Sequence, residues 1–306
     1  MVSVIIPNYN HAAYLRQRIE SVLNQTCQDM EIIILDDCSS DQSKDIIEKY
    51  RHHPLVSHIV YNRVNSGSTF KQWKKGLTLA KGNWIWIAES DDYCDNDFLE
   101  SLLGIKNSNC LLRYCASIPV NFNGEQFPDM NYGVVDKNEY QAEEYLCDYF
   151  IANNLIINAS CVIIEKNILD QSITSFVLNH RLFGDWLVWI NALEKTDIFF
   201  LNLPKNYHRH HSGTVRNQLE KNYEELILFR KEVTRSLLRS SLKTKSLLVK
   251  INNKMLSNAF GLAACSLIKE KSFLKSLPFI IKATFNSGFT ISYLKDAVYW
   301  ALKANR

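Results

Sequence analysis

The sequence is poor in the residues that build disordered or fibrous chains, since only 10 of its 306 residues are glycine and 6 are proline. Hydrophobic residues make up 46% of the chain, enough to bury one large or two ordinary cores. Strong charge of one sign is also missing, because the formal net charge is only +3 at pH 7. We therefore expect a globular protein that does not bind nucleic acid.

Long apolar runs are absent as well. The longest uncharged stretch, residues 149–164, contains three asparagines and falls short of the ~20 apolar residues that a spanning helix needs. The apolar run before Pro7 is too short for the core of a signal peptide. The eight cysteines form no CxxC pair and no zinc-site spacing, which favours reduced, mostly buried thiols. Together these features predict a cytoplasmic protein.

Charge is distributed unevenly along the chain. Residues 1–220 hold 19 Lys and Arg against 27 Asp and Glu, a net of −8, whereas residues 221–306 hold 16 against 5, a net of +11. The basic part also has apolar runs of helical period, SFLKSLPFIIK and ISYLKDAVYWALK. Such helices either lie on an anionic membrane surface or pack on the rest of the chain with their lysines in solvent. We place a domain boundary here, with domains at 1–215 and 216–306.

Short apolar runs alternate with segments of helical period over the first hundred residues. Strands are predicted at 2–6, 31–35, 58–61 and 84–88, and helices at 15–23, 40–50 (with Ser40 as N-cap) and 70–80. This order predicts a parallel sheet covered by helices, with right-handed crossovers. Further along, 111–120 and 156–164 read as strands and 139–149 and 180–194 as helices. No strand is predicted after residue 217.

Polar residues follow each of the first four predicted strands, at the edge where open α/β sheets bind ligands. Two of these positions are acidic: Asp36-Asp37 follows the second strand, and Glu89-Ser90-Asp91-Asp92 follows the fourth. Carboxylates gathered at one edge repel one another unless a divalent cation joins them, and hard oxygen ligands favour Mg²⁺ or Mn²⁺. The alternative is that they are solvated turn formers. No GxGxxG or P-loop pattern follows any strand, which argues against a dinucleotide site.

Several motifs in order resemble family 2 glycosyltransferases: VSVIIPNYN, EIIILDDCSSD, NSG and WIWIAESDDYCDNDFLE, then LFGDWLVW at 182–189 and NYHRHHSGTVR at 206–216. The resemblance covers about residues 1–215. It implies the GT-A fold, an α/β architecture with a mixed, mostly parallel sheet flanked by helices, here with a C-terminal helical extension. It also implies inverting, metal-dependent transfer of a sugar from a nucleotide-sugar donor such as a UDP-sugar to an acceptor hydroxyl, in polysaccharide or glycoconjugate synthesis.

The resemblance also implies roles for single residues. Asp91 is the expected metal ligand together with His211, and Asp185 is the expected general base. Tyr9 would lie against the nucleobase, and Asp36 or Asp37 would bind the base or ribose. Lys71 or Lys74 would meet the donor phosphates, or else lie on a solvated helix face. The positions expected to bind the nucleotide-sugar are Pro7, Tyr9, Asn10, Asp36, Asp37, Asn65, Lys71, Glu89, Ser90, Asp92 and Arg209.

Two positions depart from the family pattern. Glu89 stands where the family usually has Asp, and Gly184 stands where it often has Glu. They keep open the alternative of a non-catalytic saccharide-binding protein with a decayed site. A sugar-nucleotide nucleotidyltransferase is a second alternative, although PNYNHAAY lacks the glycine-rich basic loop such an enzyme needs. A phospho-acceptor domain would use Asp36 and Asp37 but would leave Asp91 and Asp185 without roles. A lipid-linked acceptor would suit a protein on the inner face of the membrane.

Overall fold

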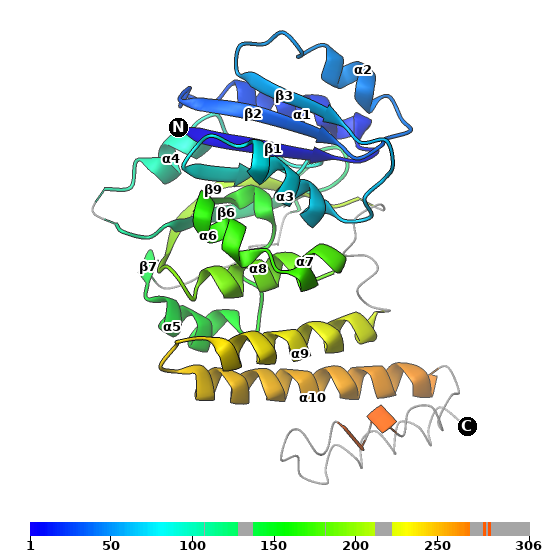
Figure 1. Cartoon of the computed structure of the whole chain (residues 1–306), viewed down its shortest axis with the longest axis vertical. Helices are drawn as coiled ribbons and strands as arrows, with labels where there is room; N and C mark the ends of the chain where they lie inside the picture. Colours follow the sequence, from blue (N-terminus) through cyan, green and yellow to red (C-terminus); the bar gives the residue numbers. More distant parts are fainter. Residues whose placement is uncertain are drawn as a thin grey trace. The chain divides into compact units, whose positions relative to one another are not determined.

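The computed structural model of the chain describes residues 1–106, 108–127, 137–180, 182–211, 222–269, 278, 279, 281 and 282. The chain divides into two compact units. The first comprises Met1–Tyr145 and Asn154–Thr214, and the second comprises Leu146–Asn153 and Val215–Arg306. The second unit therefore includes a short segment, Leu146–Asn153, that the sequence assigned to the first domain. Figure 1 shows the ribbon with its elements labelled.

The first unit contains one sheet. Within the described residues its strands are β1 (Val2–Asn8), β2 (Met30–Asp36), β3 (Val56–Tyr61), β4 (Trp84–Ile87), β5 (Tyr93–Cys94), β6 (Leu112–Val120), β7 (Glu139–Tyr140), β8 (Val162–Glu165) and β9 (Ile198–Arg209). Their order is β3-β2-β1-β4-β8-β6-β9-β5, with β7 added beside β9. Strands β3, β2, β1 and β4 are parallel, as predicted, and every residue of β1 and β2 is buried. Burial on both faces explains why these strands are almost wholly apolar.

The other half of the sheet is mixed. Strand β8 pairs antiparallel with both β4 and β6, whereas β9 runs parallel to β6 and antiparallel to β5 and β7. The predicted α/β class with a mixed, mostly parallel sheet is confirmed.

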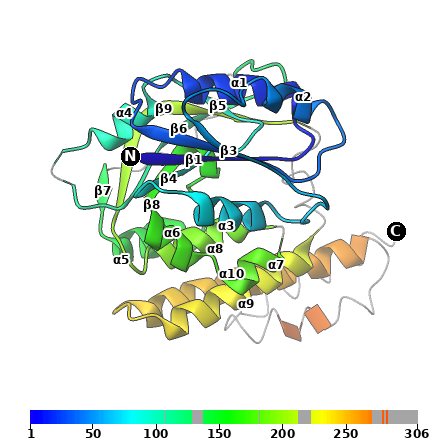
Figure 2. The ribbon, with the colours of Figure 1, turned by 45° about the horizontal axis from the view of Figure 1, so that its top comes forward.

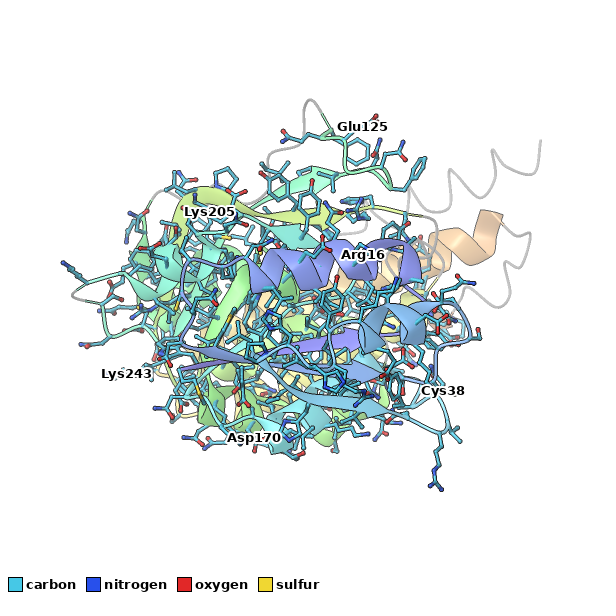
Figure 3. All side chains as sticks on the ribbon, turned by 90° about the horizontal axis from the view of Figure 1, so that it is seen from above. Arg16, Cys38, Glu125, Asp170, Lys205 and Lys243 are labelled. Carbon is cyan, nitrogen blue, oxygen red and sulfur yellow. The ribbon has the colours of Figure 1, made fainter. Side chains whose placement is uncertain are left out.

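Helices cover both faces of this sheet. They are α1 (Ala12–Leu23), α2 (Ser43–Glu48), α3 (Thr69–Leu79), α4 (Phe98–Leu103), α5 (Ala142–Tyr145), α6 (Lys166–Ser172), α7 (Ser175–Asn179) and α8 (Gly184–Ala192). Figure 2 shows α1 and α2 on one face and α3, α6, α7 and α8 on the other. Figure 3 shows Arg16 of α1 and Asp170 of α6 on these opposite sides. Helix α8 is buried on almost all sides, which is typical of a helix enclosed in a core.

Three predicted elements differ from the structure. The helix predicted at 139–149 begins as strand β7 and continues as α5 and a π-helical turn at Leu146–Phe150. Ser40 is not a helix N-cap, because α2 is capped at Gln42 and Ser40 instead donates to the side chain of Asn10. The strand predicted at 156–164 forms only at its end, as β8, and is preceded by a 3₁₀ turn at Ala159–Cys161. That turn holds the loop after β4, as described below.

Strand β9 was missed by the sequence analysis. Its register with β6 shifts around Cys115 and Ala116, which pair with Leu201 and Pro204. The residues between these partners form a bulge, where proline is tolerated in a sheet. Because NLPKN reads as a turn, the sequence hid a strand that carries Arg209 to the site.

The second unit contains helices α9 (Tyr223–Arg239) and α10 (Lys245–Lys269) and a π-helical turn, η1 (Leu146–Phe150). The two long helices pack on each other around a cluster of Ile227, Leu256, Ala259, Phe260 and Ala263. Arg230 of α9 is also buried in this unit, and it donates to the carbonyl oxygens of Ile151 and Ala152 and to Asn252. Burial lowers the pKa of Arg230 to about 10.

Other predictions concern thiols and membranes. Four of the free cysteines, at 94, 110, 115 and 161, are buried, whereas Cys38 is exposed. Among the described residues, no helix combines the length and apolar character needed to cross a bilayer. The apolar runs at 272–282 and 291–303 lie mostly outside the described residues.

Gly76 sets the distance between α3 and β1. A Cβ added at this position would lie 2.5 Å from Cγ2 of Ile5, a side chain that is fully buried. Overpacking of this kind costs about 1–3 kcal/mol, against a gain of about 1 kcal/mol from alanine's helix propensity. We therefore expect Gly76→Ala to lower the free energy of unfolding by up to about 2 kcal/mol in urea titrations. Thr78→Ala, at an exposed position of the same helix, is the control and should leave stability near that of the wild type. Equal stability of both variants would contradict the close packing of α3 on β1.

Candidate functional site

The loop after β4 carries three carboxylates, and the structure holds each of them differently. Asp92 is 2% exposed. One of its oxygens accepts hydrogen bonds from Asn158 and Ser160, both at 2.6 Å, and the other accepts the backbone N–H of Arg209 at 2.9 Å. Burial and the neighbouring charge of Asp91 raise its pKa. Asp92 therefore anchors the loop, and its oxygens are occupied by groups of the chain itself.

Glu89 is held from the side of α3. Its carboxylate accepts a hydrogen bond from Trp73 Nε1 at 2.9 Å and one from Thr69 at 3.4 Å. Burial, together with the nearby charge of Asp91, raises the pKa of Glu89 to about 8. The extra methylene that distinguishes Glu from Asp thus lets this carboxyl reach the indole of Trp73.

Asp91 is the carboxylate that remains available. Its side chain is 18% exposed, and its Oδ2 lies 3.1 Å from Nε2 of His211. Burial alone would raise the pKa of Asp91, but the hydrogen bond to His211 and the charges of His11, His211 and His208 hold it below its ordinary value. Asp91 is therefore an anionic group that faces histidines.

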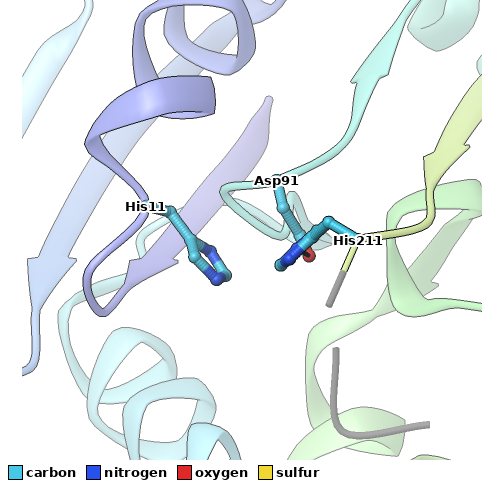
Figure 4. A group of neighbouring side chains, drawn as sticks. All are labelled: His11, Asp91 and His211. Atoms are coloured by element: carbon cyan, nitrogen blue, oxygen red, sulfur yellow. Dashed lines mark hydrogen bonds and ion pairs between the residues drawn. The ribbon is translucent and has the colours of Figure 1, made fainter. Parts of the chain in front are cut away.

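Three of these side chains converge from separate segments. Figure 4 shows His11 coming from the turn before α1, Asp91 from the loop after β4, and His211 from the segment after β9. One ligand atom of each lies within 4.8 Å of the others. A carboxylate with two imidazoles is a chemically sound donor set for a divalent cation, so the residues fit the metal that the sequence implies. The group consists of Asp91 and His211, the two ligands named from the sequence, and of His11, which the sequence analysis did not name.

Two buried arginines support the loop. Arg209 is 2% exposed, and it donates to the carbonyl oxygens of Asp91, Asn121 and Phe122 and to the side chain of Gln17. Its guanidinium is thus engaged within the protein and ties the loop to α1. Arg18 is fully buried, and it donates to the carbonyl of Glu89. Both guanidinium groups contact the loop that carries the three carboxylates, and their positive charge offsets the repulsion among those carboxylates.

The ends of β1 and β2 form a second polar group. Pro7 lies inside β1, which continues to Asn8, and Asn8 donates to Asp36 at 2.8 Å. Asp36 also accepts the backbone N–H of Ser39. Asn10 has a left-handed backbone, with φ at 56°, and this turn leaves Tyr9 48% exposed. Tyr9 is therefore open to a ligand at this edge.

Asp37 organises the segment that follows β3. It is 5% exposed and accepts hydrogen bonds from Asn62, Ser66 and Gln72. Asn65 donates to the backbone carbonyl of Asp37, so Asp37 holds this loop in place.

The two lysines considered for the donor phosphates differ in their surroundings. Lys71 is exposed and donates to the carbonyl of Ser66 at 2.9 Å. Lys74 pairs with Asp170 at 2.7 Å. Of the two, Lys71 lies beside the loop at the sheet edge.

Asp185 lies in the first turn of α8 but is not its N-cap. The N-cap is Phe183, whose φ of 59° places an aromatic residue in the left-handed region, a strained conformation typical of functional segments. Gly184 has no room for a side chain, because a Cβ there would lie 2.4 Å from the ring of Phe70. This contact explains why a glycine stands where the family often has Glu. Phe70 in turn contacts Trp73, with ring centroids 4.9 Å apart, and so links α8 to Glu89.

Sequence reasoning missed several residues of this site, and the signals for them were weak. Ser90 was expected to bind the donor, but its hydroxyl lies 2.8 Å from Nδ1 of His11. His11 directly follows the PNYN turn, and this position at the edge of the sheet was the one sequence feature that could have identified it. Ser160 lay inside a predicted strand, and nothing in its local pattern indicated a contact with the acidic loop.

Comparisons with known proteins agree with this fold. The family described as Glycosyl transferase family 2 matches residues 3–170. The chain is 31% identical, over 64% of its own length and 73% of the relative's, to the putative teichuronic acid biosynthesis glycosyltransferase TuaG of Bacillus subtilis (strain 168). It is 34% identical to the poly(ribitol-phosphate) beta-N-acetylglucosaminyltransferase TarS of Staphylococcus aureus (strain Mu50 / ATCC 700699), over 32% of this chain but only 17% of TarS.

Solved structures add a likeness in fold. The crystal structure of S. aureus TarS 1-349 in complex with UDP-GlcNAc superposes with a TM-score of 0.68 at 21% identity, covering 92% of this chain and 79% of that one. At this identity the likeness concerns the fold alone.

The raised pKa of Glu89 makes stability depend on pH. Because the pKa is about 8 in the folded chain against an ordinary 4.5, the folded state binds more protons than the unfolded state between these values. Stability should therefore fall as pH rises from about 5 to 8. Glu89→Gln removes this contribution, so with a chelator present its melting temperature relative to the wild type should increase over that range.

Thermal unfolding at a series of pH values measures this difference. Glu100→Gln, at an exposed carboxyl, is the control and should follow the wild-type curve. A pH-independent difference between Glu89→Gln and the wild type would show that Glu89 is ionised in the folded chain at neutral pH.

Proposed function

We propose a donor, an acceptor and a set of catalytic roles for this chain, which belongs to glycosyl transferase family 2. It is accordingly an enzyme that moves a sugar from a nucleotide-sugar donor to an acceptor. The observation that carries the proposal is the acidic turn after β4, in which Asp91 faces His211 while Glu89 and Asp92 are held by other groups of the protein.

The donor that we propose is a UDP-sugar and the acceptor a hydroxyl group on a cell-envelope polysaccharide or glycoconjugate. The printed name of TuaG refers to teichuronic acid and that of TarS to poly(ribitol-phosphate). A structure of TarS 1-349 contains UDP-GlcNAc. These names support polymer synthesis with a UDP-linked donor, and which sugar moves is the first question for experiment.

In this proposal the nucleotide lies at the edge formed by the ends of β1, β2 and β4. Tyr9 is exposed there and offers an aromatic face to the base, while Asp36 or Asp37 binds the base or ribose. Lys71 donates to Ser66 in the loop that Asp37 holds, and it would face the diphosphate. Arg209 keeps the Asp91 backbone in place through the bond from its Nε.

A divalent cation held by Asp91 and His211 would neutralise the charge that develops on the leaving diphosphate. Asp185 removes the proton from the acceptor hydroxyl while the oxygen of that hydroxyl bonds to the anomeric carbon. The bond between that carbon and the diphosphate oxygen breaks in the same step. Attack from the face opposite the diphosphate inverts the anomeric centre.

Two of the three other functions raised by the sequence are a nucleotidyltransferase and a decayed site, and both are less well supported. A nucleotidyltransferase lacks support from the family match. A decayed, non-catalytic site was suggested by Glu89 and Gly184, but both have local physical reasons: Glu89 bonds to Trp73, and Gly184 makes room for Phe70. Neither departure therefore indicates loss of activity.

We also propose that the protein works on the cytoplasmic face of the membrane and contacts anionic lipid through its basic C-terminal part. The net charge of +11 over residues 221–306 supports this, as do exposed leucines on α9 and α10 such as Leu238 and Leu247. Co-sedimentation of the full chain with anionic and neutral vesicles tests the proposal. Binding that is equal for both vesicle types, or unaffected by salt, would contradict it.

A screen of UDP-, GDP- and dTDP-sugars tests the donor assignment. Release of free nucleotide is measured with Mn²⁺, with Mg²⁺ and with chelator. We expect UDP-sugars to be cleaved in the presence of metal. Cleavage of none of the donors under any of these conditions would contradict the proposed function.

Asp185→Asn should abolish most transfer while donor binding survives. The amide keeps the size of the side chain but cannot take a proton, so kcat should fall by ~10²- to 10⁴-fold. Donor affinity, measured by calorimetry with UDP, should change little, because proton removal develops only in the transition state.

Asp45→Asn is the matched control, since Asp45 also lies in the first turn of a helix and is exposed. It should keep wild-type turnover. If Asp185→Asn does so too, Asp185 contributes only to the helix and another group must act as the base.

A further inference from the structure

We propose that His11 is a third protein ligand of the divalent cation, and that the resulting set of two imidazoles and one carboxylate selects Mn²⁺ over Mg²⁺. The inference rests on the proposed function, since it assigns the cation to the same site. Neither the sequence motifs nor the names of the similar proteins assign a role to His11 or a preferred metal to the site.

The spacing of the three groups suits one ion. Ligands at about 2.1 Å from a cation and at right angles to each other lie about 3 Å apart. His211 Nε2 and Asp91 Oδ2 are 3.1 Å apart, which is this spacing. The ligand atom of His11 lies within 4.8 Å of both, so a small side-chain adjustment brings all three to one ion.

The imidazole of His11 is positioned by the same loop that carries Asp91. Its Nδ1 lies 2.8 Å from the hydroxyl of Ser90, which orients the ring, so Nε2 is the nitrogen that the proposal assigns to the cation. Metal-bound histidines generally have such a partner on their second nitrogen. The ring also stands at 88° to that of His211, with centroids 5.5 Å apart.

A purely local role does not explain His11. The residue is the N-cap of α1, but its side chain makes no capping hydrogen bond to that helix. The ring is turned instead toward Ser90 and His211 (Figure 4). Its position therefore serves the loop after β4 rather than the helix.

The donor set decides the metal. Mg²⁺ prefers oxygen ligands, and affinity for imidazole sites increases from Mn²⁺ along the first-row metals. The nearby carboxylates are already engaged, because both oxygens of Asp92 accept hydrogen bonds and Glu89 is bound to Trp73, so the proposal counts Asp91 as the one carboxylate ligand. With one carboxylate and two imidazoles, Mn²⁺ should bind more tightly than Mg²⁺.

Titration of the full chain with Mn²⁺, followed by the electron paramagnetic resonance signal of the free ion, tests the inference without activity. The wild type should bind Mn²⁺ in the absence of nucleotide, and Mg²⁺ should displace it only at a large excess. His11→Ala should weaken Mn²⁺ binding by tenfold or more, as expected when a ligand is lost. His11→Asp, which replaces nitrogen by oxygen, should narrow the difference between Mn²⁺ and Mg²⁺.

His52→Ala is the control, because it removes an exposed histidine outside the site, and it should titrate as the wild type. Circular dichroism establishes that each variant is folded. Wild-type Mn²⁺ affinity in folded His11→Ala would overturn the inference, as would a wild type that binds no Mn²⁺ without nucleotide or does not prefer it to Mg²⁺. The proposed function fails separately, if no nucleotide-sugar is cleaved by a wild type that binds Mn²⁺ as described.

Discussion

Three carboxylates lie within four residues, at Glu89, Asp91 and Asp92, and their mutual repulsion is the constraint on which the rest of the site depends. The protein meets it by giving each carboxylate a different environment. Asp92 is buried among hydrogen-bond donors, and Glu89 bonds to an indole and has a pKa of about 8. Asp91 has a lowered pKa and is partly exposed, facing His211. The Asp91 carboxylate is thus the one of the three that faces histidines, while the other two are bonded to groups of the chain itself.

Much of the fold follows from supplying these partners. The 3₁₀ turn at Ala159–Cys161 brings Ser160 to Asp92 and to the backbone N–H of Glu89. Strand β9 delivers the backbone and guanidinium of Arg209, and the same segment continues to His211. Helix α3 supplies Trp73, and its neighbour Phe70 fills the space before α8. Elements far apart in sequence are therefore coupled through a single loop.

The parallel half of the sheet could be predicted from the sequence, because β1 and β2 are buried on both faces and so read as apolar runs. The ends of these strands could be predicted as the place of the candidate site, because open α/β sheets bind ligands at the carboxyl edge. Strand β9 could not, since its bulge and Pro204 resemble a turn. The different environments of the three carboxylates could not be predicted either, because Ser160, Trp73 and Arg18 contact this loop only once the chain has folded. No periodicity or motif spacing in the sequence indicated that His11 would be a candidate ligand.

We propose that a divalent cation binds between Asp91 and the two histidines, and not at the acidic pair that follows β2. Crystals of the full chain grown with UDP and Mn²⁺, measured for anomalous scattering of manganese, test it most directly. We expect an anomalous peak within bonding distance of Asp91, His211 and His11. A peak at Asp36 and Asp37 instead, with none at Asp91, would contradict it.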